Sequence, residues 1–205
     1  MLQLPTSGLD PRASWLSEPH VLPLMSLIAS WRGEGLDVPN VDPNDGGVFA
    51  RALFLLESPG PRAVGTGFIS RDNPDPSARN MTTALAGAGF TRADTILWNV
   101  VPYCVSTLGQ NRNASPAQVR AAAPYTQRFV DLLMNLEVVV FCGKRAQLAE
   151  RYLSIGVATL LTYHPGAMAY NRPRCRKHLN STFAAAHALI GRSASRVSVP
   201  DLQLV

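Results

Sequence analysis

The sequence predicts an α/β fold, a three-layer α/β/α arrangement with a central four-stranded parallel sheet. Four short apolar runs indicate the strands, at residues 52–56, 95–100, 138–142 and 158–162. Continuous apolar runs of this kind are typical of strands covered on both faces, as in parallel sheets. Helix-like segments separate the runs, and this alternation favours right-handed βαβ units. With 205 residues, the chain is long enough to bury the core of one such domain.

The expected helices are marked by residues that suit helix ends. An amphipathic segment spans residues 18–32, and an Ala- and Leu-rich segment spans residues 79–88 and ends at glycine. Ser115 is a suitable N-cap before the proline that opens a helical pattern over residues 116–136. Two further helices are expected at residues 143–153 and 176–190.

The chain is expected to divide into three parts. Residues 1–48 form an N-terminal helical arm and loop packed on the core, residues 49–191 a single α/β domain, and residues 192–205 a C-terminal tail. No apolar stretch approaches the roughly 18 residues of a membrane-spanning helix, and the amino terminus lacks the pattern of a secretory signal. We therefore expect a cytoplasmic monomer with no membrane partner.

The charge balance is compatible with a nucleic-acid partner. The chain has 19 basic and 14 acidic residues, a formal net charge of +5, and only two lysines, Lys144 and Lys177. The planar guanidinium of arginine suits phosphate, so the arginine excess favours a nucleic acid. A compositional bias of the source genome would explain it equally well, so charge alone decides nothing.

Three cysteines, Cys104, Cys142 and Cys175, lie far apart in the sequence. No C-x-x-C motif and no Cys/His spacing typical of zinc sites is present. The pattern predicts reduced thiols and no metal site, and it excludes a small disulfide scaffold.

Polar side chains follow three of the predicted strands at the point where each strand ends. Glu57 and Ser58 follow the first, Asn99 ends the second, and His164 follows the fourth. The carboxyl ends of parallel strands meet at one edge of a sheet, where ligands bind in open α/β folds. The sequence therefore predicts one site that contains a carboxylate, a hydroxyl, an amide and a histidine.

Three motifs at these strand ends carry a family resemblance. They read Leu56-Glu-Ser-Pro-Gly60, Trp98-Asn-Val-Val-Pro102 and Thr162-Tyr-His-Pro-Gly-Ala-Met168. Their residues, order and intervals resemble the motifs of the uracil-DNA glycosylase superfamily over about residues 50–190. The closest match is to the bacterial and archaeal branches whose first motif is Gly-Glu-Ala-Pro-Gly. The resemblance implies a monofunctional glycosylase that flips uracil out of DNA, hydrolyses its N-glycosidic bond and leaves an abasic site, the first step of base-excision repair.

The chemistry assigns roles to two of the motif residues. Negative charge develops on the departing base, and His164 is the natural hydrogen-bond donor to it, whether the imidazole is neutral or charged. The amide of Asn99 can donate to a uracil carbonyl and accept from N3–H, and cytosine lacks that N–H. The alternatives are purely local roles, with the histidine in a turn and the asparagine capping a strand.

The resemblance assigns further residues to the base and the water. Phe68 stands where the family places its stacking aromatic, although a loop Phe is as often a core residue. Either Glu57, or Ser58 with the backbone carbonyls of Pro59 and Gly60, is expected to position the attacking water, and Pro59 and Gly60 also border the uracil. The reserve candidates for the water are Asp72 and Asn73.

The third motif continues into a segment suited to DNA. Met168 is the expected wedge that fills the gap left by the flipped base, with Ala167 and Tyr170 as alternatives. The cations that follow suit phosphates beside the lesion, although they would also suit a solvated turn: Arg172, Arg174, Arg176 and Lys177.

Two departures from the family pattern matter. Leu56 replaces the leading glycine of the first motif. The branch with the glutamate motif normally holds an iron–sulfur cluster on four cysteines, two of them near the amino terminus, whereas no cysteine precedes Cys104 here. We therefore predict no cluster and no cofactor.

The expected partners are DNA containing uracil and the abasic-site product, in a bacterial-type cytoplasm where the protein associates with the nucleoid through DNA. Two alternatives remain. One is a glycosylase-like DNA-binding protein that recognises deaminated or abasic DNA with weak turnover. The other is a hydrolase that uses Ser58 and His164, but Pro59 removes the backbone N–H that an oxyanion hole would need.

Overall fold

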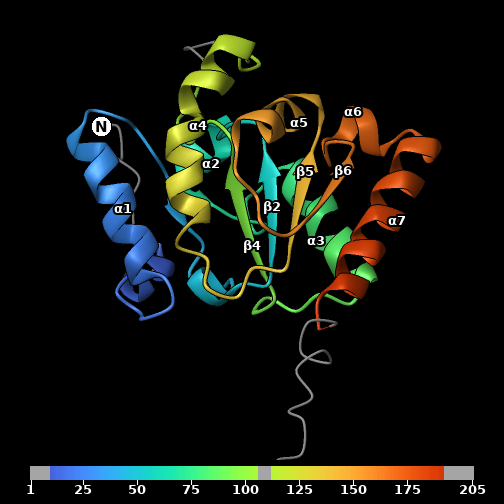
Figure 1. Ribbon diagram of the computed structural model, residues 1–205, viewed down its shortest axis with the longest axis horizontal. Coiled ribbons are helices and arrows are strands. Elements are labelled where there is room, and N and C mark those ends of the chain that lie inside the picture. Colours follow the sequence, from blue (N-terminus) through green and yellow to red (C-terminus); the bar gives the residue numbers. More distant parts are fainter. Residues whose placement is uncertain (1–9, 106–111, 192–205) are drawn as a thin grey trace, which may run out of the picture.

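The computed structural model describes residues 10–105 and 112–191 and confirms the predicted α/β class (Figure 1). Four parallel strands form the central sheet in the order β4-β2-β5-β6. Their bounds match the four apolar runs to within one residue: β2 (Ala52–Leu56), β4 (Thr95–Asn99), β5 (Val138–Cys142) and β6 (Ala158–Thr162). The tail expected at residues 192–205 lies outside the described residues.

The strand order reverses at β2, in the middle of the sheet. Leu56 at the end of β2 pairs with Asn99 at the end of β4, and β2 pairs with β5 on its other side. The chain therefore leaves β2 in one direction to form β4 and later returns on the opposite side as β5. Such a reversal of strand order opens a crevice at the carboxyl edge of a parallel sheet.

Helices cover both faces of the sheet (Figure 1). α3 packs against α7 and α4 packs against α5, with the sheet between the two pairs. A separate two-stranded parallel sheet joins β1 (Asn40–Val41) to β3 (Phe68–Ile69). The helices are α1 (Leu22–Gly33), α2 (Pro61–Thr66), α3 (Pro76–Ala88), α4 (Pro116–Val130), α5 (Lys144–Ala149), α6 (Ala167–Tyr170) and α7 (Pro173–Leu189), and the 3-10 turns are η1 (Pro11–Trp15), η2 (Gly47–Phe49) and η3 (Glu150–Tyr152).

The cap of α3 explains why this helix begins three residues before its expected start. Asp75 is the N-cap, and its Oδ1 accepts hydrogen bonds from the backbone N–H groups of Ser77 at 2.8 Å and Ala78 at 3.0 Å. Pro76 follows at the first helical position, where its missing N–H costs nothing. The same cap-and-proline pattern at Ser115 confirms the predicted start of α4, with a full capping box, but the helix ends at Val130 and not at residue 136.

The N-terminal segment shares the core of the sheet. Leu24, Ile28 and Trp31 of α1 are completely buried. The ring of Trp31 meets Tyr125 of α4 edge-on at 5.5 Å and lies 6.3 Å from Trp98 of β4. α1 therefore covers the β4 side of the sheet through aromatic contacts. No helix in the part of the chain that the structure describes is long and apolar enough to cross a membrane.

A buried charge cluster ties this segment to the strand ends. Asp45 forms an ion pair with Arg71 Nη2 at 3.2 Å and accepts a hydrogen bond from Arg92 Nη1 at 3.1 Å, and Asp42 accepts from Arg92 at 3.1 Å and from the hydroxyl of Ser70. Ser70 and Arg71 directly precede the loop that leads to α3. Burial raises the pKa of Asp45 to about 7, although both arginines oppose this shift.

The raised pKa predicts a pH-dependent stability that Asp45→Asn removes. Between pH 4 and 7 the folded protein binds a proton at Asp45 that the unfolded chain, with an ordinary pKa, releases. The free energy of unfolding should therefore fall as the pH rises through this window, by at most about 1.4 kcal/mol per pH unit. Urea denaturation at several pH values should show a flatter profile for Asp45→Asn than for the exposed control Asp131→Asn. Parallel profiles for the two variants would contradict the assignment.

Candidate functional site

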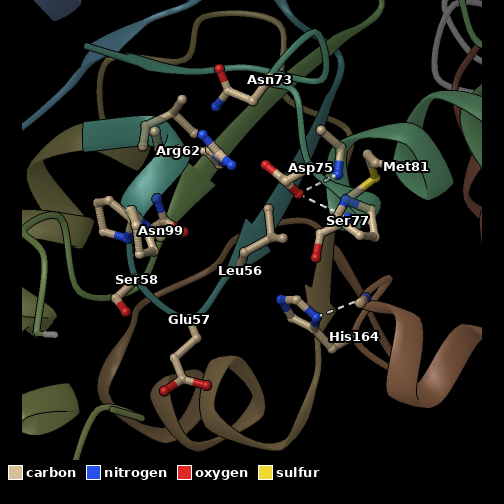
Figure 2. A pocket seen from close by; sticks show the side chains of 18 of the residues that line it. Leu56, Glu57, Ser58, Arg62, Asn73, Asp75, Ser77, Met81, Asn99 and His164 are labelled. Atoms are coloured by element: carbon tan, nitrogen blue, oxygen red, sulfur yellow. Dashed lines mark hydrogen bonds between the residues drawn. The ribbon is translucent and has the colours of Figure 1, made fainter. Parts of the chain in front are cut away.

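A cavity of about 640 Å³ opens at the carboxyl edge of the sheet (Figure 2). The loops that follow β2, β4 and β6 line it together with the first turn of α3. Of the residues expected in the site, the cavity brings together Glu57, Ser58, Pro59, Gly60, Asn73, Asn99, His164, Ala167, Met168 and Arg172.

Asn99 presents an unpartnered amide to this cavity. It is the last residue of β4 and only 4% exposed, because the strands and helices around it form the core. No described group makes a hydrogen bond to its side chain. Its amide is not among the fully buried polar groups that lack a partner, so its atoms are open to the cavity, where a ligand can form hydrogen bonds with them.

His164 is held as a neutral ring with a defined tautomer. The backbone N–H of Gly166 donates to Nδ1 at 2.9 Å, so this nitrogen carries a lone pair and the ring proton resides on Nε2. Burial lowers the pKa of His164, and the negative charge of Asp75 only partly opposes this. Figure 2 shows Nε2 directed toward the interior of the cavity. The arrangement therefore offers a neutral hydrogen-bond donor at neutral pH.

Two glycines leave room for this ring. A Cβ at Gly166 would lie 2.9 Å from Nδ1 of His164, and a Cβ at Gly143 would lie 2.9 Å from its Cβ. Gly143 also has a φ of +97°, which other residues rarely adopt. The position of the imidazole therefore depends on the absence of side chains at both places.

Asp75 is the functional candidate that sequence reasoning missed. Its Oδ1 caps α3, and no described donor bonds its Oδ2. Figure 2 shows this second oxygen directed into the cavity, on the side of Asn99. The Asp-Pro pair at positions 75 and 76 was the signal, because it marks a helix start in a segment that follows the first motif.

The two water-positioning candidates of the first motif lie at the cavity wall. Glu57 accepts a hydrogen bond from the backbone N–H of Ala114, and Figure 2 shows its carboxylate turned away from Asn99 and Asp75. Burial raises the pKa of Glu57, while that bond and the charge of Arg145 act in the opposite direction. Ser58 makes no hydrogen bond with a described residue.

Phe68 is not brought to the cavity. It lies in β3, 2% exposed, and its ring is covered by the guanidinium of Arg12 at 4.2 Å. Its neighbour Ile69 lines the cavity instead, because successive side chains of a strand point to opposite faces. The structure thus places an aliphatic side chain where an aromatic was expected.

The mouth of the cavity carries the DNA-binding candidates of the third motif. Met168 is 83% exposed at the rim. Arg172, the N-cap residue of α7, lines the cavity. Tyr170 packs partly against the core, with the guanidinium of Arg176 5.8 Å from its ring centre. Arg174 and Lys177 are exposed in the first turns of α7, outside the cavity lining.

The cysteines do not fit a four-cysteine cluster. Cys142 is fully buried in β5, and burial strongly raises the pKa of its thiol, which disfavours the thiolate that binds iron. Cys104 and Cys175 supply only two further thiols. Across residues 10–105 and 112–191, no three His, Cys, Asp or Glu side chains are grouped to hold a metal ion.

Comparison with known proteins identifies the superfamily of this chain. The family model of the uracil DNA glycosylase superfamily matches residues 43–186, and the chain belongs to this superfamily. A search of the curated proteins found no match. Among solved structures, a variant of mimivirus UNG in complex with UGI is similar, with 14% sequence identity and a TM-score of 0.40 over 83% of this chain and 75% of that chain.

The hydrogen bond from Gly166 predicts the protonation of His164. Nitrogen-15 NMR of the histidine-labelled protein at pH 7 should show an unprotonated Nδ1 and a protonated Nε2 for this residue, with a pKa below the ordinary value of histidine. Gly166→Ala should displace the ring and change this signature while the sheet stays folded. An imidazolium at pH 7, or a proton on Nδ1, would contradict the assignment.

Proposed function

We propose that this protein is a uracil-DNA glycosylase: it flips uracil out of DNA and hydrolyses the bond between the base and deoxyribose, leaving an abasic site. One observation carries the proposal. The unsatisfied amide of Asn99 and the neutral donor of His164 border the same cavity, and both lie at strand ends within the matched family region. The first group suits recognition of a base edge, and the second suits stabilisation of a leaving base.

Asn99 would select uracil through complementary hydrogen bonds. Its NH₂ donates to the O4 carbonyl and its oxygen accepts from N3–H. Cytosine presents an amino group and an unprotonated N3, so both atoms of the amide would face a partner of the wrong kind. Because Asn99 is almost completely buried, water could not replace the lost bonds. A site of this type rejects the wrong base by up to about four to five orders of magnitude.

His164 would stabilise the departing base. Breaking the N-glycosidic bond leaves the electron pair on the base, and negative charge builds up on its carbonyl oxygens. The Nε2–H of a neutral imidazole can donate to the O2 carbonyl as this charge develops, without transferring its proton. A donor that is fixed in advance loses no energy to reorientation, and the Gly166 hydrogen bond fixes this one.

Asp75 is the carboxylate best suited to the sugar and the water. Bond breaking gives the sugar positive charge, which a nearby anion stabilises, and the attacking water needs an acceptor for its proton. The unpartnered Oδ2 of Asp75 faces the cavity, whereas the carboxylate of Glu57 is turned toward Ala114. We therefore assign the water to Asp75, with Glu57 and Ser58 as the alternatives from the first motif.

DNA would approach across the rim beside α6 and α7. Met168 is exposed at the position of a wedge that fills the gap in the base stack. The cations at the start of α7 would contact phosphates: Arg172, Arg174, Arg176 and Lys177. The substrate is then uracil-containing DNA, and the abasic product occupies the same rim after the base has left.

The alternative of a serine hydrolase has no support in the contacts. Ser58 and His164 make no hydrogen bond to each other, and Nδ1 of the histidine is occupied by Gly166. Pro59 also supplies no N–H for an oxyanion hole.

Strand scission of an oligonucleotide that carries one uracil tests the proposal. The wild-type protein, with EDTA present, should create alkali-labile sites at the uracil. His164→Ala should reduce the rate about 10²–10³-fold, as expected for loss of one preorganised donor. Asn99→Ala should lower the rate on uracil and weaken discrimination against cytosine. Tight binding of the wild type without any scission would instead favour the DNA-binding protein with weak turnover.

A pair of matched variants tests which carboxylate acts. Asp75→Asn keeps an oxygen that can cap α3, so the helix should remain intact while the charge is lost. We expect this variant to lower the single-turnover rate about 10²–10⁴-fold, the range of general-base contributions, with little change in thermal stability. Glu57→Gln should have a much smaller effect on the rate. The reverse order of the two effects would return the role to Glu57.

A further inference from the structure

The arginines of this protein differ in their partners. Within residues 10–105 and 112–191, ion pairs with carboxylates hold Arg12, Arg51, Arg71 and Arg92. Arg62 and Arg172 instead line the cavity, and no carboxylate of the described residues lies within ion-pairing distance of either. Two guanidinium groups at one opening therefore lack an internal counter-charge.

The two arginines approach the cavity from different loops. Arg62 belongs to α2, which follows β2, and Arg172 caps α7, which follows β6. β5 lies between β2 and β6 in the sheet, so the two loops stand on separate sides of the opening. Figure 2 shows the guanidinium of Arg62 turned into the cavity, in the part between Asn99 and Asp75.

We propose that Arg62 and Arg172 form a phosphate clamp that holds the DNA backbone on both sides of the flipped nucleotide. The inference rests on the proposed function. Arg172 is already assigned to phosphate there, and Arg62 adds a cation on the other side of the opening. Guanidinium binds phosphate oxygens through two parallel N–H···O hydrogen bonds, and backbone phosphates are the anions that accompany every flipped nucleotide.

Exposure and charge favour phosphate over the base as the partner of Arg62. Arg62 lines the cavity but is exposed, so its guanidinium is accessible to the DNA backbone, which must remain outside when the base enters. Asn99 and His164 already supply neutral donors for the base. An unneutralised cation beside the sugar would also oppose the positive charge that forms there, whereas a phosphate-bound guanidinium would not.

The salt dependence of binding tests the clamp. The probe is a fluorescein-labelled duplex with one 2′-fluoro-2′-deoxyuridine, whose fluorine destabilises positive charge on the sugar and so prevents cleavage. Anisotropy titrations between 50 and 200 mM KCl give the slope of log K against log salt concentration. Loss of one phosphate contact should reduce the magnitude of this slope by about 0.9. Arg62→Ala and Arg172→Ala should each do so, and the double variant should show about twice the change.

Arg128→Ala is the matched control, because Arg128 is exposed in the last turn of α4 and does not line the cavity. It removes the same charge and should leave the slope unchanged.

An unchanged slope for Arg62→Ala, an equal change for Arg128→Ala, or an altered preference for uracil over thymine without a slope change would each overturn the clamp. A wild type that fails to cleave uracil DNA but shows the predicted slopes overturns only the glycosylase proposal. A wild type without affinity for the duplex overturns both.

Discussion

The parallel register of the four strands is the constraint on which the rest of the site depends. Leu56 pairs with Asn99, and Cys142 pairs with Thr162, so the loops that follow these strands start at the same level of the sheet. A shift of one residue in β4 would turn Asn99 to the opposite face, because side chains alternate along a strand. The complete burial of β4 and β5, and of β2 up to Leu55, opposes such a shift, since each strand would have to exchange its packing on both faces. The core therefore sets the geometry of the polar edge.

The parts of the fold that sequence reasoning predicted are those with a strong local signal. The four strands are uninterrupted apolar runs, and Asn99 and His164 follow from the rule that parallel strands end at one edge. α2 and α6 were not predicted, because helices of this size carry too few residues to show a period. Phe68 was assigned to the site by its position in the chain, but the pleat of β3 turns Ile69 to the cavity and Phe68 to Arg12. Which of two neighbours faces a cavity depends on pairing with β1, and the Pro- and Asn-rich sequence around β1 gave no sign of a strand.

Asp75 and Arg62 show a second limit of prediction from the sequence. Each has an ordinary local explanation in the sequence, as a helix cap and as a charged residue of a short helix. Their possible roles follow only from the approach of α3 to α6 and from the place of α2 beside the end of β2, which are tertiary contacts. The motifs indicated the family and many of the residues that line the cavity, whereas the electrostatic surroundings of those residues required the packed structure. Ion pairs elsewhere in the protein matter in the same way, because they occupy carboxylates that could otherwise neutralise Arg62 and Arg172.

The cap of α3 links the carboxylate of Asp75 to the dynamics of a helix end. Two backbone N–H groups hold one oxygen and thereby aim the other, so the orientation of the carboxylate lasts only as long as the first turn of α3 remains closed. Terminal turns of helices open locally at a lower free energy than the protein unfolds. Mild heating or low denaturant would thus release this oxygen while the sheet and its core persist. If Asp75 acts on the water as proposed, activity would be lost before the fold, and the temperature limit of catalysis would depend on the first turn of α3.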